Sequence, residues 1–480
     1  MKNFLSLLFI CTLSIQCAGL PKEVKNTAHL PQIIFVPGYY GSYLKRVKDN
    51  KRVWFTAGQA LWGDQTLALT GDGIQVPDVV ELVVDGVFNS LELIPGIMSK
   101  DIYGDTIATL EKNFLGQANI VPFAYDWRQD ITHSSQQLAQ LVDNLYAQGA
   151  PKVAIVSHSM GGLITSYYLL YGKQNLENAR PNLYGAKKLY AVVMAATPFQ
   201  GTMTVFRNMQ FGVQFGLNKK ALENYAVASF PSSYQLLPQY PESLLSESGE
   251  NHSDWIFKEG QWRKHGWSLF RNASELNPAI LLNRRKFTQK MLLLGKTTYK
   301  KIHEYKINSN SAVPFLYFYN DETPTINQAL WDQKEQNLLF PGINLRNSLK
   351  NYDQKQLLSK GDGTVTEKSA QPPEQFATTF PNLQIRNRVG EHLEILKQEK
   401  TINEMVRFLQ KALNLRSTKP VDTYNAKMND PAASGQPSGW TQYSRAMGLR
   451  LFGGLVSKAN VCPTSPPRVA GQGMKPTGGK

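Results

Sequence analysis

The segment Val153-Ala-Ile-Val-Ser-His-Ser159-Met-Gly-Gly162 decides how this chain folds. Its first four residues are apolar and mostly β-branched, which is typical of a buried strand. The apolar run that follows, residues 163–170, has the pattern of a helix. A serine on the sharp turn between such a strand and helix needs small residues two positions before and after it, and Ser157 and Gly161 meet that need. The segment therefore predicts that Ser159 is a nucleophile rather than part of an ordinary turn.

Apolar runs of the same kind recur on both sides of this segment. They predict strands at residues 33–36, 119–125, 153–156, 189–196, 313–319 and 383–389. Residues 134–148 and 402–413 have helical patterns between and after these runs. Strands that are apolar on both faces and alternate with helices indicate a mostly parallel sheet covered by helices, so the predicted fold class is α/β.

Two long stretches interrupt this alternation and are predicted to be insertions. The first covers about residues 43–99 and contains Trp54 and Trp62. The second covers about residues 201–311 and has few strand signals. Connections of this length in a compact domain are usually functional, as caps or lids over a site. The whole domain is predicted to span residues 30–414.

A serine nucleophile needs a histidine base and a carboxylate that orients the base. On a strand–turn–helix of this kind, the acid and the histidine follow the serine in that order along the chain. Of the four histidines after Ser159, only His392 lies between the last predicted strand and the last predicted helix. Asp362, within Gly361-Asp-Gly-Thr-Val365, and Asp321, just past the preceding strand, are both candidates for the acid, although Asp-Gly is also a common turn pair. This order predicts an α/β-hydrolase fold and a serine hydrolase or acyltransferase.

The composition is that of a globular protein, with 42% hydrophobic and 19% charged residues among 480. The three cysteines are Cys11, Cys17 and Cys462, so the predicted domain contains none. This excludes a disulfide, a cysteine-based zinc site and a cysteine nucleophile within the domain. The serine chemistry requires neither a metal nor an organic cofactor, and none is expected.

Residues 1–19 are predicted to be a secretory signal peptide. A positive residue precedes an apolar stretch at residues 4–15, and small residues follow, with cleavage expected after Gly19. The alternative is a lipoprotein signal with lipidation at Cys17, although Gln16 stands where such signals need a small residue. Either signal predicts an exported protein, which is secreted, periplasmic or associated with the cell envelope.

The formal net charge of +15 favours anionic partners. Residues 415–480 hold nine Lys and Arg against two Asp, in a Pro-, Gly- and Ser-rich composition that predicts a basic, largely disordered tail. No zinc finger or RNA-binding signature is present in the sequence, so a phospholipid surface is favoured over nucleic acid. A membrane-binding amphipathic helix is the competing interpretation of the tail. The apolar residues that would form its face are Trp440, Tyr443, Met447, Leu451 and Leu455.

Together the motifs resemble those of the lecithin:cholesterol acyltransferase family, which includes lysosomal phospholipase A2 and phospholipid:diacylglycerol acyltransferases. The matching pieces occur in the family's order over roughly residues 33–413. They are Val36-Pro-Gly38 with Gly41-Ser42, Tyr125-Asp-Trp-Arg128, the turn at Ser159, Gly361–Val365 and Glu391-His-Leu393. The resemblance implies that Asp362 is the acid, that one insertion is a membrane-contacting subdomain and that the other is a lid. Animal members carry a disulfide near the first tryptophans that this chain cannot form, so packing alone would hold these insertions.

Two backbone N–H groups are expected to stabilise the oxyanion that forms during the reaction. The fold places one at Met160, directly after the nucleophile, and the resemblance places the other at Tyr39. Trp127, Trp54 and Trp62 are the predicted substrate-binding residues, with Trp127 near the acyl pocket. The competing interpretation of the motif around Trp127 is a structural one, in which it only holds the end of a strand.

The predicted reaction is a two-step acyl transfer from a lipid ester through Ser159. Water as the acceptor makes the protein a phospholipase or lipase, and a sterol or glyceride alcohol makes it an acyltransferase. The expected partner is a phospholipid membrane or a lipoprotein-like lipid surface. Three alternatives stay open: a general carboxylesterase on neutral esters, an inactive lipid-binding envelope protein, and a basic nucleic-acid binder.

Overall fold

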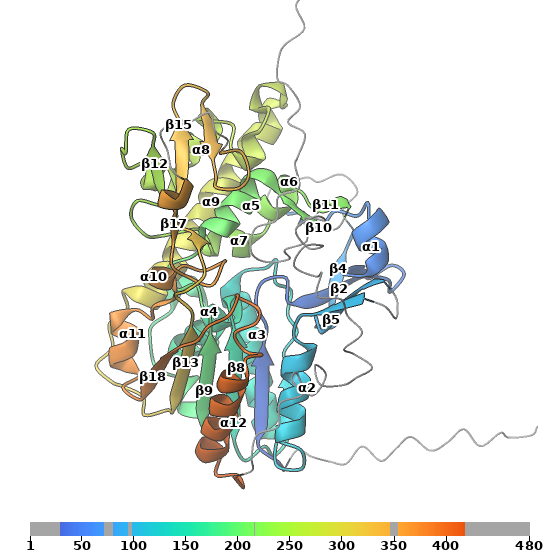
Figure 1. Ribbon diagram of the computed structural model, residues 1–480, viewed down its shortest axis with the longest axis vertical. Coiled ribbons are helices and arrows are strands. Elements are labelled where there is room, and N and C mark those ends of the chain that lie inside the picture. Colours follow the sequence, from blue (N-terminus) through green and yellow to red (C-terminus); the bar gives the residue numbers. More distant parts are fainter. Residues whose placement is uncertain (1–28, 72–79, 95–97, 216, 346–353, 418–480) are drawn as a thin grey trace, which may run out of the picture.

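The computed structural model describes residues 29–71, 80–94, 98–215, 217–345 and 354–417 (Figure 1). The predicted signal peptide, Cys17 and the tail beyond residue 417 lie outside the described residues.

Six parallel strands form the central sheet, in the order β18-β13-β9-β8-β1-β7 (Figure 1). Each predicted strand corresponds to one of them, so the predicted α/β fold class is confirmed. The strands are β1 (Gln32–Val36), β7 (Asn119–Pro122), β8 (Val153–His158), β9 (Ala191–Ala195), β13 (Phe315–Tyr319) and β18 (Leu383–Asn387). β1, β8 and β9 are buried along their whole length, because each has a neighbouring strand on both sides and helices cover the sheet.

The two edge strands are shorter than predicted. β7 ends at Pro122, which has no N–H to donate to the ladder, whereas the prediction ran to residue 125. β18 ends at Asn387 and carries only half-buried and exposed side chains, because β13 is its one neighbour in the sheet.

Helices cover both faces of the sheet. α2 (Gly104–Asn113) and α12 (Glu399–Leu413) lie on one face, and α3 (Ile131–Ala147) and α4 (Met160–Tyr171) lie on the other (Figure 1). α3 begins before the predicted residue 134, because the Asp130 carboxylate caps it by accepting from the Thr132 N–H at 2.8 Å. Every residue of α4 is buried, because this helix packs against the sheet, α3 and α9 (Pro278–His303).

The first predicted insertion forms a small antiparallel sheet beside the central one (Figure 1). β2 (Ser42–Arg46) pairs with β3 (Arg52–Trp54) and with β4 (Leu82–Val87). Leu44, Val53 and Trp54 belong to the same continuous hydrophobic core as the central strands, so packing holds the insertion in place. Its other elements are α1 (Ala57–Trp62), β5 (Ser90–Ile94) and β6 (Met98–Asp101).

The second predicted insertion forms a cap over the end of the sheet where Ser159 lies (Figure 1). Its elements are α5 (Met203–Phe211), β10 (Val213–Phe215), β11 (Asn218–Leu222), α6 (Asn224–Ala228), α7 (Pro231–Gln235), β12 (Leu244–Ser246), α8 (Glu259–Lys264) and α9. A later segment, which no sequence pattern predicted, also joins the cap. β15 (Ala329–Asp332) pairs with both β12 and β16 (Asn337–Leu339), and strands this short leave almost no periodic signal.

Four further short elements lie in the later part of the described chain. β14 (Thr325–Ile326) pairs with β17 (Leu358–Ser359), and α10 (Glu367–Ala370) and α11 (Glu374–Thr379) follow. Within the described residues, no helix combines the length and the apolarity needed to cross a bilayer.

Candidate active site

Ser159 occupies a strained turn between β8 and α4. Its backbone has a positive φ of 55° with ψ −127°, which is uncommon for a residue with a side chain. The turn packs closely against the end of β1, because a Cβ atom at Gly161 would lie 2.5 Å from the carbonyl oxygens of Val36 and Pro37. The predicted need for a small residue at position 161 therefore has a specific origin, the contact with β1.

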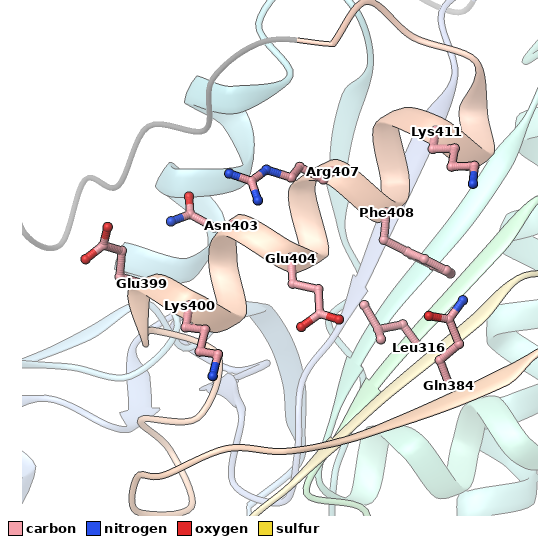
Figure 2. A pocket seen from close by; sticks show the side chains of 9 residues that line it. All are labelled: Leu316, Gln384, Glu399, Lys400, Asn403, Glu404, Arg407, Phe408 and Lys411. Carbon is pink, nitrogen blue, oxygen red and sulfur yellow. The ribbon is translucent and has the colours of Figure 1, made fainter.

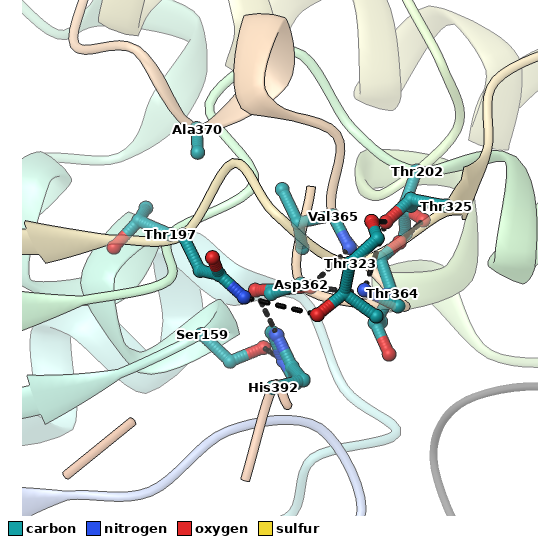
Figure 3. Close-up of polar contacts among 12 residues, drawn as sticks. Ser159, Thr197, Thr202, Thr323, Thr325, Asp362, Thr364, Val365, Ala370 and His392 are labelled. Carbon is teal, nitrogen blue, oxygen red and sulfur yellow. Dashed lines mark hydrogen bonds and ion pairs between the residues drawn. The ribbon is translucent and has the colours of Figure 1, made fainter. Parts of the chain in front are cut away.

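The structure brings Ser159, His392 and Asp362 into one hydrogen-bonded chain (Figure 3). His392 Nε2 lies 2.8 Å from Ser159 Oγ, and His392 Nδ1 lies 2.7 Å from Asp362 Oδ2. Since a carboxylate only accepts hydrogen bonds, Nδ1 carries the proton and Nε2 can accept one from the serine. All three side chains are buried, with 8% exposure at Ser159.

The loop around Asp362 holds this carboxylate in place. Asp362 Oδ1 accepts from the backbone N–H groups of Thr364, at 2.9 Å, and Val365, at 2.7 Å. Thr325 Oγ1 supports the same loop by accepting from the Gly363 N–H at 2.8 Å (Figure 3). The other candidate acid, Asp321, instead accepts from the Asn387 side chain and makes no contact with His392 among the described interactions.

A second histidine connects the parts of the site. His158 Nε2 lies 2.7 Å from the backbone carbonyl oxygen of His392, and its Nδ1 lies 2.8 Å from Tyr103 Oη. Because a carbonyl only accepts, Nε2 carries the proton and Nδ1 accepts from the Tyr103 hydroxyl. The same hydroxyl accepts from the Gly38 N–H at 2.9 Å. Burial, the neighbouring His392 and Lys397 hold the pKa of His158 well below its usual value, so the ring is neutral.

The two expected oxyanion donors lie beside this network. Met160 begins α4 directly after Ser159, and Tyr39 follows Gly38 and lines the same cavity as Ser159. Neither backbone N–H has a hydrogen-bond partner among the residues that the structure describes. The Tyr39 side chain is held separately, by a 2.8 Å hydrogen bond between its hydroxyl and Ser233 Oγ.

Two of the predicted tryptophans, Trp54 and Trp127, are not part of the cavity wall, which corrects the prediction that they bind substrate. Trp127 and Trp54 are fully buried, and their indole N–H groups donate to the backbone carbonyls of Ser42 and Tyr40, each at 3.1 Å. Both rings pack against Tyr40, which does line the cavity. They therefore support the wall from behind, since a fully buried ring with a satisfied N–H has no surface left for substrate. Trp62 ends α1, and its side chain is outside the described ones.

A cavity of about 100 Å³ opens at Ser159 and His392. The ends of the central strands and the loops after them form one wall, with Tyr39, Tyr40 and His158, and the cap forms the other, with Arg207 and Phe215. This volume is smaller than the ~300–1,000 Å³ of sites that enclose a drug-sized ligand, so a lipid ester needs displacement of cap residues to enter. Among the described lining residues, Arg207 is the only Asp, Glu, Lys or Arg.

A larger hollow, of about 790 Å³, lies between α12 and the strands β13 and β18 (Figure 2). Its charged lining residues are Glu399, Lys400, Glu404, Arg407 and Lys411. Glu404 forms ion pairs with Arg386, at 2.6 Å, and with Arg388. Among its described lining residues, the hollow has no serine, threonine or histidine side chain, so the smaller cavity is the better candidate for the active site.

Sequence reasoning missed three residues of the site: Tyr103, His158 and Arg207. His158 belongs to the segment Val153–Gly162, but no sequence pattern in that segment indicates that its ring contacts the backbone of His392. Tyr103 and Arg207 come from segments that the sequence analysis assigned to no strand or motif. Within the described residues, no group of three or more His, Cys, Asp and Glu side chains could hold a metal ion.

A parallel sheet in this order, with serine, acid and histidine following β8, β13 and β18, defines an α/β-hydrolase with serine-hydrolase chemistry. The model of the lecithin:cholesterol acyltransferase family matches residues 61–405, and the chain belongs to this family. Family and fold support an enzyme that is a lipid-ester hydrolase or an acyltransferase.

Solved structures also resemble this chain, at low identity. The Tle4–Tli4 complex matches at 14% identity and a TM-score of 0.48, covering 81% of this chain and 99% of that one. The mature Bacillus licheniformis lipase BlEst2 matches at 12% identity and a TM-score of 0.33, covering 80% of this chain and 92% of that one. The RedJ thioesterase of Streptomyces coelicolor matches at 9% identity and a TM-score of 0.28, covering 84% of this chain and 98% of that one. No curated protein sequence matches the chain. These similarities are low, so the assignment rests on the strand order and the family match.

Proposed function

We propose that the chain is a phospholipase or lipid O-acyltransferase that cleaves glycerophospholipid esters through an acyl-enzyme on Ser159. The observation that carries this proposal is the hydrogen-bonded chain from Ser159 through His392 to Asp362, buried at the base of a cavity. Membership of the lecithin:cholesterol acyltransferase family supports a lipid ester as the substrate.

The first half of the reaction forms the acyl-enzyme. Ser159 Oγ attacks the ester carbonyl carbon while its proton passes to His392 Nε2, and Asp362 stabilises the resulting imidazolium. The Met160 and Tyr39 N–H groups donate to the oxyanion of the tetrahedral intermediate, a contribution worth about 10²–10³ in rate per donor in comparable enzymes. The carbon–oxygen bond to the leaving alcohol then breaks, and His392 returns the proton to that alcohol.

The second half repeats these steps with an acceptor hydroxyl. His392 takes the acceptor's proton as its oxygen attacks the acyl carbonyl, and returns a proton to Ser159 Oγ as the acyl group leaves. Water gives a free fatty acid, and a sterol or glyceride gives a new ester. Apart from the ester and the acceptor, these steps use only groups of the chain itself.

A lipid surface fits the exposed side chains beside the cavity. Phe211 and Leu217 flank β10, which lines the cavity, and they are 41% and 68% exposed. Lys219 and Lys220 are exposed on the adjacent β11. Apolar side chains next to cations suit the boundary between acyl chains and anionic headgroups. We propose this rim as the contact with lipid in place of Trp54, which is fully buried.

The direct test is mass spectrometry of the products from vesicles that contain phosphatidylcholine and a sterol. We expect lysophospholipid together with either fatty acid or sterol ester, and neither from Ser159→Ala protein. Cleavage of soluble short-chain esters without any action on vesicles would instead identify a general carboxylesterase. Vesicle binding by wild-type protein with no product and no reaction with a fluorophosphonate would identify an inactive lipid-binding protein.

The exported location stays part of the proposal, since the segment on which it depends lies outside the described residues. Detection of the mature chain outside the cytoplasm, with its N-terminus at residue 20, would support cleavage after Gly19. A lipid-modified N-terminus at Cys17 would support the lipoprotein alternative.

A further inference from the structure

Arg207 is a buried cation whose charge is not balanced by the protein around it. It lies in the middle of α5 and is 8% exposed. Its Nε and Nη2 donate to Asn208 Oδ1, at 3.2 and 3.1 Å, and this oxygen belongs to a neutral amide. Among the described residues, no Asp or Glu forms an ion pair with Arg207, and its Nη1 has no hydrogen-bond partner.

Such an arrangement is unfavourable in an empty site. Removing a guanidinium from water costs free energy that a carboxylate or another anion normally offsets. Burial lowers the pKa of Arg207 to about 10, which still leaves the group charged at neutral pH. A mid-helix position also keeps Arg207 away from the partial negative charge at the C-terminal end of α5. The remaining way to balance the charge is a bound anion.

The position of Arg207 shows which molecule could bring that anion. Arg207 and Ser159 line the same cavity, one from the cap and the other from the sheet. No Asp, Glu or Lys lies among the described lining residues, so an anion there meets one cation and no carboxylate. The forked donors of a guanidinium match the oxygens of a phosphate, and in a glycerophospholipid the phosphate is only a few bonds from the ester groups.

We propose that Arg207 binds the phosphate of the glycerophospholipid whose ester Ser159 attacks, and thereby selects phospholipids over neutral glycerides. This inference rests on the proposed function and adds a specificity-determining residue to it. Asn208 orients the guanidinium from one side, which leaves Nη1 for a phosphate oxygen. A neutral glyceride would leave the cation unpaired, so discrimination follows from burial rather than from shape.

The test compares two soluble substrates that differ only at the headgroup, dihexanoyl phosphatidylcholine and dihexanoylglycerol. The readout is the ratio of their kcat/KM values, which cancels a general loss of active protein. Arg207→Met should lower this ratio about 10- to 100-fold, because a charge-assisted hydrogen bond is lost on one substrate only. Arg207→Lys should lower this ratio less, since lysine keeps the positive charge but lacks the paired N–H donors of the guanidinium.

The matched control is Arg271→Met. Arg271 also meets α5, by donating to the Gln210 carbonyl at 2.8 Å, but it does not line the cavity, so the ratio should stay at the wild-type value. A wild-type ratio in Arg207→Met would overturn the inference while Ser159-dependent cleavage left the proposed function standing. Equal activity of wild type and Ser159→Ala would instead overturn the proposed function. Wild type that cleaves only the glyceride would overturn the inference and the phospholipid substrate together.

A measurement on wild-type protein covers the case in which Arg207→Met does not fold. Glycerophosphocholine and inorganic phosphate should inhibit cleavage of dihexanoylglycerol, and glycerol at the same concentration should not. Inhibition by glycerophosphocholine alone would place a headgroup, rather than free phosphate, on Arg207. Stronger inhibition by hexanoate than by either phosphate compound would assign the cation to the fatty-acid product and overturn the inference.

Discussion

His158 Nε2 donates to the backbone carbonyl of His392 across 2.7 Å, so the residue beside the nucleophile holds the peptide of the proposed base. The other side of the same ring accepts from Tyr103, whose hydroxyl in turn accepts from the Gly38 N–H. One chain of neutral hydrogen bonds thus joins three loops: the turn at Ser159, the loop of His392 and the loop that carries Tyr39. Each of these loops supplies one group to the proposed reaction.

This relationship predicts a loss of rate when the network is cut. Tyr103→Phe and His158→Gln should each lower kcat on a soluble ester by about tenfold or more with little change in KM, because small displacements of reacting groups are costly. The double variant should be no slower than the slower single variant, since both changes break one network. Steady-state kinetics on the four proteins give the comparison.

Tyr171→Phe is the matched control for these variants. Like Tyr103→Phe, it removes the hydroxyl of a buried tyrosine. The Tyr171 hydroxyl donates to the backbone carbonyl of Lys301 at 2.7 Å, and Tyr171 does not line the cavity. Its kcat should equal that of wild type. Additive losses from Tyr103→Phe and His158→Gln would mean that the two residues act separately.

The neutral state of His158 predicts how stability changes with pH. Its pKa in the folded protein lies well below the ~6.5 of an unfolded chain, so the unfolded state binds the proton more tightly. Stability from this residue is complete above about pH 6.5 and falls as the pH drops from there toward the folded pKa. Burial lowers the pKa of His303 to about 4, so His303 also makes the folded protein less stable as the pH falls below about 6.5.

The measurement is the free energy of unfolding by urea between pH 7.5 and pH 5 in wild type and His158→Gln. The variant should be less stable at pH 7.5, with a shallower loss on acidification. It lacks one of the three described histidines whose pKa is lowered in the folded protein, the others being His265 and His303. Parallel curves for the two proteins would show that His158 is not held neutral by the fold.

The sequence was enough to place the sheet, Ser159 and His392, because each depends on local patterns and on chain order. It could not choose between Asp362 and Asp321 without a family resemblance, since both follow β13 and only the folded loop directs one carboxylate at His392. Trp54 and Trp127 were predicted to bind substrate, but the core buries both side chains, and the competing structural interpretation of the motif around Trp127 fits this burial. Arg207 had no local signal, since the lack of an Asp or Glu beside it among the described cavity residues is a property of the folded protein.

The two aspartates make a direct comparison. Asp362→Asn should lower kcat by roughly 10⁴, because an amide in place of the carboxylate favours the wrong tautomer of His392. Asp321→Asn should have little effect, since Asp321 contacts only the Asn387 side chain among the described interactions. Kinetics with a soluble ester measure both, and the opposite ranking would mean that the acid has been assigned to the wrong residue.

The proposed lipid-contact rim predicts a variant that fails only at an interface. Leu217→Asp should reduce activity on phosphatidylcholine vesicles about tenfold, the loss expected from one apolar contact, and leave cleavage of a soluble ester at the wild-type rate. Leu115→Asp is the control, because Leu115 is 83% exposed but follows α2, at a distance from the cavity wall. Equal vesicle activity in both variants would remove Leu217 from the contact surface.

The most direct test of an acyl-enzyme on Ser159 is the intact mass of the protein, quenched during turnover of a slowly deacylated ester. We expect one added acyl group on wild type, located by peptide mapping at Ser159. A folded Ser159→Ala variant should gain no acyl group and cleave the ester about 10⁶ more slowly. An acyl group on any other residue, or a Ser159→Ala variant that cleaves esters at the wild-type rate, would contradict an acyl-enzyme on Ser159.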